Sequence, residues 1–164
     1  MRIRKLAGTL VNALLYLALA GLLILTVPRI AGFQCYTVIS GSMEPAIPVG
    51  SIAYVKECEP ENIKKGDVIT FLVGQDGTKV THRVTETDYE KRIFVTKGDA
   101  NQAEDPAPVS WENVCGVLAG SLPLAGYLLD FLGDWRGKAA AAAYLGFLCL
   151  VSELLAVGKW KKGE

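Results

Sequence analysis

Hydrophobic residues along the chain gather into two long blocks, one near each end, and the segment between them holds only short apolar runs. The first block is uncharged from Leu6 to Pro28, about 23 residues. A helix rises about 1.5 Å per residue, so this block exceeds the roughly 30 Å hydrocarbon core of a bilayer. The pattern therefore predicts a first membrane-spanning helix within residues 1–28.

A cleaved signal peptide is the alternative interpretation of this block, because Arg2, Arg4 and Lys5 form a basic segment before it. However, the apolar run is longer than the roughly 7–15 residues of a signal-peptide core. The stretch from Val27 to Ala31 also lacks a small-x-small cleavage site. We therefore expect an anchor that is retained.

The second apolar block, Ala139 to Gly158, is interrupted only by Glu153. Trp135 and Trp160 bracket it as interfacial anchors would, and lysines follow it. A second spanning helix with a basic tail is the prediction for residues 138–164. A helix buried in a hairpin is the alternative.

Short β-branched and aromatic runs fill the middle of the chain, separated by Gly, Pro, Asp and Asn. They are Cys35–Ile39, Ser51–Val55, Asp67–Val73, Lys79–Thr85, Arg92–Thr96 and Val114–Leu118. Glycines and a proline argue against a continuous helix up to Leu129, so we expect a last strand leading into a membrane-surface segment at about 117–134. The predicted fold is mainly β, an all-β domain over residues 29–137 between an N-terminal and a C-terminal transmembrane helix.

The distribution of charge predicts an orientation. The whole chain has 17 basic and 17 acidic side chains, which argues against nucleic-acid binding driven by phosphate neutralisation. Residues 29–137 hold 10 basic and 15 acidic side chains, whereas both ends are basic. Because basic residues flank spans on the cytoplasmic side, we expect both termini in the cytoplasm and the acidic domain outside it.

The four cysteines of the chain show no metal-binding spacing. A disulfide between Cys58 and Cys115 is permitted in an oxidising compartment, but sequence alone does not fix the pairing.

His82 is the single histidine of the chain. On an alternating strand it shares one face with Val80 and Val84, whereas Lys79 lies on the other face. A histidine on an apolar face serves either as a core residue bonded to a backbone carbonyl or as a general base. The second role requires a nucleophile beside it.

Three other residues are candidate partners of this imidazole. Ser42 lies where a strand ends, in a segment rich in Ser, Gly and Pro. Asp99 and Asp105 lie in a loop after a strand, and one of them can orient the imidazole as in a Ser-His-Asp triad. Asp99 is slightly favoured, because it directly follows Gly98 at the end of that strand. Taken singly, Ser42 is weak evidence of a nucleophile, and the two aspartates are better explained as turn residues.

The order of these segments resembles the sequence boxes of type I signal peptidases. The boxes are Ser40–Pro45, Gly66–Val68, His82–Val84 and Gly98–Asn101, with Asp105 and Pro106 following. With a histidine in its third box, the chain resembles the endoplasmic-reticulum-type branch of this family, which is found in archaea, eukaryotes and some Gram-positive bacteria. The other bacterial branch has a lysine there. The resemblance covers about residues 35–125.

This resemblance implies a serine endopeptidase that removes N-terminal signal peptides from exported pre-proteins at small-x-small sites. Ser42 is then the nucleophile, His82 the general base, and Asp99 and Asp105 the acidic residues, of which at least one supports His82. Ser40 is expected to join the Ser42 backbone N–H in an oxyanion hole. Four residues are expected to flank the substrate groove: Val38, Ile39, Met43 and Ile47.

The implied partners are signal-peptide-bearing pre-proteins and the lipid bilayer, with a secretion translocon left open, and no metal or other cofactor is required. The expected location is the cell membrane, with two spans. A membrane-anchored β-domain that only binds or scaffolds is the alternative function, and a self-cleaving or regulatory serine protease of related fold is a second one. The joint occurrence of four ordered boxes favours the signal peptidase.

Overall fold

A computed structural model describes residues 2–74 and 76–160 of the chain. It divides into two compact units, which are described separately. Residues Pro28–Leu129 form one unit, and the segments up to Val27 and from Asp130 form the other. The basic tail expected after Trp160 lies outside the described residues.

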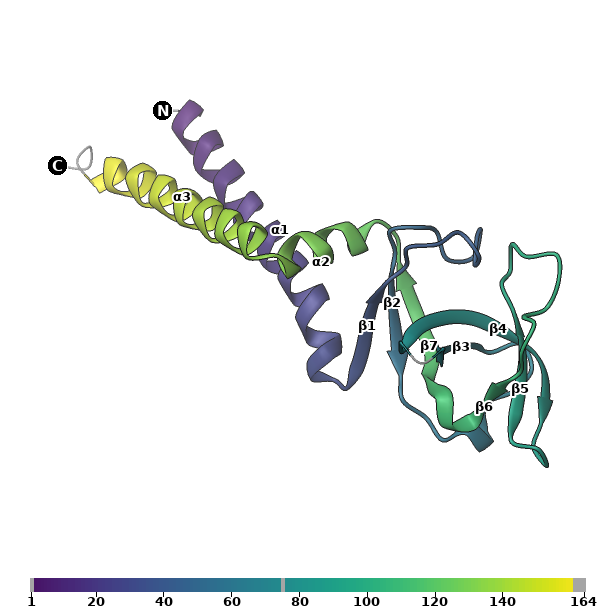
Figure 1. Cartoon of the computed structure of the whole chain (residues 1–164). Helices are drawn as coiled ribbons and strands as arrows, with labels where there is room; N and C mark the ends of the chain where they lie inside the picture. Colours follow the sequence, from purple (N-terminus) through teal and green to yellow (C-terminus); the bar gives the residue numbers. More distant parts are fainter. Residues whose placement is uncertain (1, 75, 161–164) are drawn as a thin grey trace. The chain divides into compact units, whose positions relative to one another are not determined.

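A seven-stranded antiparallel sheet makes up the first unit (Figure 1). Its strands are β1 (Phe33–Thr37), β2 (Ile52–Lys56), β3 (Val68–Val73), β4 (Thr78–Asp88), β5 (Ile93–Lys97), β6 (Val109–Ser110) and β7 (Val114–Leu122). Short 3-10 turns, η1 (Pro60–Asn62) and η2 (Trp111–Asn113), precede β3 and β7. The strand order is β1-β2-β7-β3-β4-β5-β6, so the last strand lies between β2 and β3.

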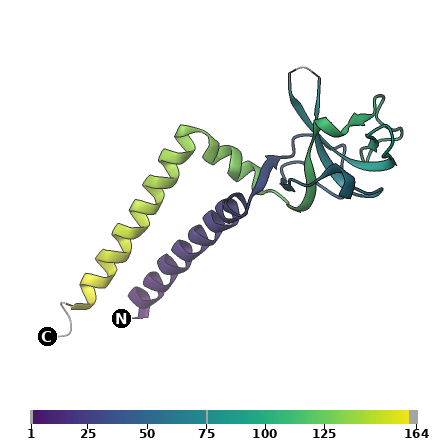
Figure 2. The ribbon, with the colours of Figure 1, turned by 90° about the horizontal axis from the view of Figure 1, so that it is seen from below.

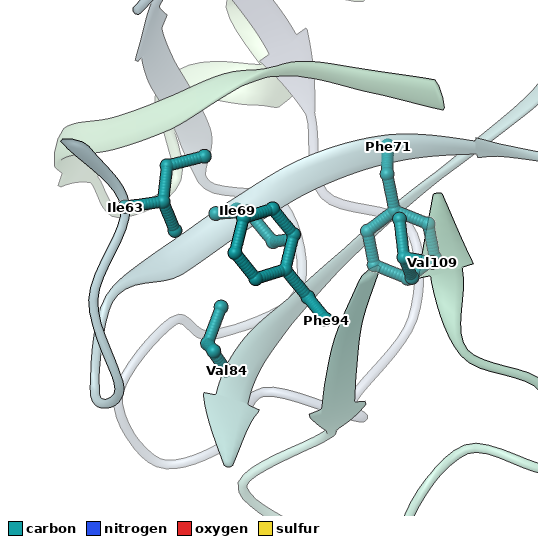
Figure 3. Close-up of a cluster of buried hydrophobic side chains, with 6 residues drawn as sticks. All are labelled: Ile63, Ile69, Phe71, Val84, Phe94 and Val109. Carbon is teal, nitrogen blue, oxygen red and sulfur yellow. The ribbon is translucent and has the colours of Figure 1, made fainter. Parts of the chain in front are cut away.

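The sheet has a hydrophobic core under its β3 to β6 half. Six buried side chains form it: Ile63, Ile69, Phe71, Val84, Phe94 and Val109 (Figure 3). Alternation along β3, β4 and β5 supplies most of them, because every second side chain of a strand points to the same face. This packing fixes the register of β4 on β5, which opposes Val84 to Thr96 and Arg83 to Lys97.

The six predicted strands are all present, with ends shifted by a few residues. The two-residue strand β6 was not predicted, since two residues are too few to show an alternating pattern. After Val114 the chain forms a strand, as expected, but this strand extends to Leu122. A short helix, α2 (Ala125–Gly133), then follows. It was not predicted.

Helices hold more residues than strands in the described part of the chain, so the mainly-β description applies to the Pro28–Leu129 unit and not to the whole. Two long helices account for this difference, α1 (Arg2–Ile30) and α3 (Trp135–Trp160). Each runs as one uninterrupted helix (Figure 2). Within them, Leu6–Ile30 and Trp135–Leu154 are long and apolar enough to cross a membrane.

Candidate active site

Ser42 lies in the loop between β1 and β2. Two backbone hydrogen bonds shape this loop, from Glu44 N to Gly41 O at 3.0 Å and from Ile47 N to Met43 O at 2.8 Å. The side chains of Met43 and Ile47 are buried against Val68 at the start of β3. The apolar residues on either side of the serine therefore hold the loop against the sheet and leave Ser42 partly exposed.

His82 projects from β4 toward this serine. The predicted alternation is confirmed, because His82 and Val84 are buried while Thr81 and Arg83 are only partly buried. The imidazole Nε2 lies 3.0 Å from Ser42 Oγ. Its ring meets Phe71 edge-on, with 6.3 Å between the ring centroids. The strand thus presents a mostly enclosed imidazole to a partly exposed hydroxyl.

Asp105 occupies the other side of the imidazole. Its Oδ2 lies 2.6 Å from His82 Nδ1 and 2.6 Å from the hydroxyl of Thr96. Because a carboxylate only accepts, Nδ1 carries the proton of a neutral ring and Nε2 is left to accept from Ser42. The loop after β5 returns to make this contact, with Asp105 N donating to Thr96 O at 2.8 Å.

Asp99 binds Arg83 and not the imidazole. The guanidinium donates from Nε to Oδ1 at 2.8 Å and from Nη2 to Oδ2 at 2.7 Å. These hydrogen bonds hold the pKa of Asp99 below its usual range and raise the pKa of Arg83. The expectation that Asp99 is the better partner of His82 therefore differs from the structure, which places Asp105 there.

The loop that holds Asp99 also contacts the nucleophile loop. The N–H of Ala100 donates to the carbonyl of Ser42 at 2.8 Å, which joins the loop after β5 to the loop after β1 (Figure 1). Gly98 permits this approach, because a Cβ at that position would lie 2.6 Å from Ser42 O and 2.7 Å from Asn101 Nδ2. The close packing of the two loops therefore requires glycine at position 98, the first residue of the Gly-Asp-Ala-Asn segment.

A groove of about 410 Å³ lies beside the serine and the histidine. Its lining includes the four expected residues, Val38, Ile39, Met43 and Ile47, together with Ser40, Ser42 and His82. Ile39 is 86% exposed, whereas Met43 and Ile47 are each 2% exposed. The hydroxyl of Ser40 lies 3.3 Å from that of Ser42. The loop between β1 and β2 therefore supplies both hydroxyls and part of the apolar lining of the groove.

Lys79 also lines this groove, but its ammonium group lies over the Tyr36 ring, 5.3 Å from the centroid. The nitrogen in contact with Ser42 is that of His82.

All four cysteines are free thiols, so Cys58 and Cys115 are not bridged in this structure. Burial raises the pKa of both of these thiols.

Two polar neighbours of the candidate residues, Arg83 and Thr96, were not predicted from the sequence. Arg83 lies inside the His82–Val84 box, and Thr96 ends a predicted strand. Their partners come from a loop that folds back on β5, and no local pattern in the sequence shows that return. The available signal was their place beside the candidate residues, since Arg83 directly follows His82 and Thr96 lies two residues before Gly98.

These contacts form one chain from a hydroxyl to an imidazole to a carboxylate on an antiparallel sheet. The hydroxyl is the potential nucleophile, Nε2 the acceptor of its proton, and the carboxylate the group that fixes the ring tautomer. Such an arrangement is chemically suited to acyl transfer by a serine.

Comparisons with known proteins identify the family. The family model for signal peptidase, peptidase S26, matches residues 10–106. The chain is 45% identical over 97 residues to signal peptidase I W of Bacillus subtilis (strain 168), a stretch that covers 57% of this chain and 50% of that protein. It is 34% identical over 128 residues to the signal peptidase complex catalytic subunit SEC11 of Eremothecium gossypii, covering 71% and 75%. Human SEC11C is 30% identical over 125 residues, covering 70% and 65%.

The chain belongs to the signal peptidase family, peptidase S26. The resemblance to signal peptidases found in the four sequence boxes is thereby confirmed. The aligned stretch spans about half the length of the Bacillus relative.

Proposed function

We propose that this chain is a membrane-bound serine endopeptidase that removes N-terminal signal peptides from exported pre-proteins. The proposal is based mainly on two contacts of the imidazole. His82 Nε2 lies 3.0 Å from Ser42 Oγ, and His82 Nδ1 lies 2.6 Å from Asp105 Oδ2. Membership of the signal peptidase family supplies the substrate class.

This geometry supports the following sequence of catalytic steps. Ser42 Oγ attacks the carbonyl carbon of the scissile bond while its proton moves to His82 Nε2. Asp105 stabilises the imidazolium through Nδ1–H and keeps the ring in one orientation. The imidazolium then gives the proton to the departing amine, and an acyl-enzyme on Ser42 remains. Water attacks this ester with His82 again as the base, which releases the signal peptide and restores the serine.

The oxyanion of the tetrahedral intermediate needs donors next to the nucleophile. The Ser42 backbone N–H and the Ser40 hydroxyl are the donors we assign to it. The position of Ser40 supports this role, since its Oγ lies 3.3 Å from Ser42 Oγ and on an exposed part of the loop. Asp99 is assigned a supporting place in the site through Arg83, not a part in proton transfer.

Selection of small-x-small sites is assigned to the groove beside Ser42. The apolar part of its lining accepts small side chains of an extended substrate, and larger side chains are excluded by steric clash. Met43 and Ile47 pack in a buried cluster with Val68, so these two lining residues cannot move aside easily for a bulky substrate side chain.

We further propose that α1 and α3 anchor the enzyme, with both termini in the cytoplasm and residues 29–137 outside it. Two helices of spanning length and the basic residues at both ends support this topology. Exposed apolar side chains at Leu124, Tyr127 and Leu128 support contact of the 117–134 segment with the membrane surface. A domain held there meets pre-proteins as they emerge, at a raised effective concentration.

The test is cleavage by the purified full chain in detergent micelles. One pre-protein carries Ala at the third and first positions before the cut, and a matched one carries Leu at both. We expect cleavage after the Ala-x-Ala site, located by mass spectrometry of the products, and little cleavage of the Leu version. Equal cleavage of both substrates, or of neither, contradicts the proposed specificity.

A further inference from the structure

Thr96 is a buried polar residue at the end of β5, and its side chain is 0% exposed. Its hydroxyl lies 2.6 Å from Asp105 Oδ2. Since a carboxylate oxygen accepts, the threonine is the donor. Its carbonyl also accepts the backbone N–H of Asp105 at 2.8 Å. One residue thus binds both the main chain and the carboxylate of the aspartate.

The same oxygen, Asp105 Oδ2, accepts from the threonine hydroxyl and from His82 Nδ1. Asp105 lies nine residues after Thr96 in a loop that follows the sheet. A carboxylate on such a loop has rotamers in which neither oxygen faces the imidazole. A second donor on Oδ2 favours the rotamer in which that oxygen reaches both Thr96 on β5 and His82 on β4.

We propose that Thr96 is a positioning residue of the catalytic site, which acts through Asp105 to hold His82 in the tautomer with Nδ1–H and a free Nε2. This inference rests on the proposed function of Ser42, His82 and Asp105. Thr96 itself touches neither the nucleophile nor the groove. Its hydroxyl restricts the aspartate, and the aspartate restricts the imidazole.

Thr96→Val removes the donor and keeps the shape of the side chain. A hydrogen bond to a charged group contributes enough for its loss to lower kcat by about ten- to a hundredfold, with KM nearly unchanged because the groove is intact. Thr96→Ser restores the donor and is expected to recover most of the rate. Thr85→Val is the matched control, since that hydroxyl donates to the backbone carbonyl of Val95, away from the site.

The single histidine makes a direct reading of the tautomer possible. In the full chain labelled with ¹⁵N-histidine, at about pH 8, where an ordinary imidazole is neutral, we expect one protonated Nδ1 and one unprotonated Nε2. Thr96→Val is expected to shift the two ¹⁵N signals toward a mixture of tautomers, and Thr96→Ser is expected to restore them. This spectrum does not depend on turnover. Failure of the positioning role is therefore distinguishable from failure of the proposed peptidase activity, which the Ser42→Ala variant tests.

Two comparisons complete the design. In an Asp105→Ala background, Thr96→Val is expected to change kcat by no more than about twofold, because the group it acts through is gone. If Thr96→Val does not fold, Thr96→Ala replaces it, because alanine also removes the donor to Asp105. A Thr96 variant that lacks the hydroxyl but keeps the wild-type kcat and a single Nδ1–H tautomer overturns the proposal. So does a rate loss of equal size with and without Asp105.

Discussion

The guanidinium of Arg83 donates two hydrogen bonds, of 2.8 and 2.7 Å, to the carboxylate of Asp99. Arg83 directly follows His82 on β4, and Asp99 lies next to Ala100, which donates to the carbonyl of Ser42. The ion pair therefore connects the strand of the candidate base to the loop after β5, and Ala100 of that loop is hydrogen-bonded to the loop of the candidate nucleophile. Because both side chains are partly exposed, we expect its contribution to stability to be modest.

Acid is expected to weaken this ion pair. The pKa of Asp99 is lower in the folded protein than in the unfolded chain, where it is about 3.9. The stabilisation is therefore complete above that unfolded value and is lost as the pH falls through the folded value. Asp99→Asn should lower the melting temperature at neutral pH and by clearly less at about pH 3. Thermal unfolding of both proteins at both pH values measures this, and an equal difference at both contradicts the account.

The two aspartates are expected to respond differently to replacement by asparagine. Asp105→Asn should fold normally and slow cleavage by roughly 10³- to 10⁴-fold, because an amide favours the wrong imidazole tautomer. Asp99→Asn should retain most of the rate and lose stability instead. Single-turnover cleavage and thermal unfolding of each variant separate the two effects. The assignment of Asp105 fails if Asp99→Asn is the slower enzyme or if both cleave at the wild-type rate.

Gly98→Ala is expected to disturb the nucleophile loop. The added methyl group would lie 2.6 Å from the carbonyl oxygen of Ser42, so one of the two loops must move. A displacement of this kind misplaces the serine, and we expect at least a tenfold loss of kcat. Gly120→Ala is the control, because a Cβ there meets nothing within 4 Å. Equal rates for the two variants would show that the close approach at Gly98 does not matter.

Alternation predicts most of the sheet, and it predicts His82 as part of a buried face, because the stretch of β4 from Thr81 to Thr85 follows the period-two pattern. It does not predict α2 or the two-residue strand β6. The partner of His82 also could not be chosen from the sequence. The place of Asp99 directly after a strand favoured it, whereas the choice depends on the return of the 98–105 loop to Thr96 and on the pairing of Arg83 with Asp99. Contacts of that kind follow from the register of β4 on β5, which is a property of the folded sheet.

The proposed topology predicts which surfaces a membrane-impermeant thiol reagent reaches. In a background without the native cysteines, Glu90→Cys lies on the exposed turn between β4 and β5 and should be labelled in intact cells. Glu164→Cys should be labelled only after the membrane is opened. The reverse result would place the catalytic domain in the cytoplasm and contradict the role in processing exported proteins.

Ser42 and His82 are proposed to act together in cleaving pre-proteins, and single-turnover cleavage of an Ala-x-Ala pre-protein by the full chain tests this pair. We predict that Ser42→Ala and His82→Ala each lose at least about 10⁴-fold in rate while folding normally, and that combining them adds little further loss, because the two residues act as a unit. Ser121→Ala, which removes a hydroxyl from β7, should cleave like the wild type. Wild-type cleavage by either Ser42→Ala or His82→Ala would contradict the account.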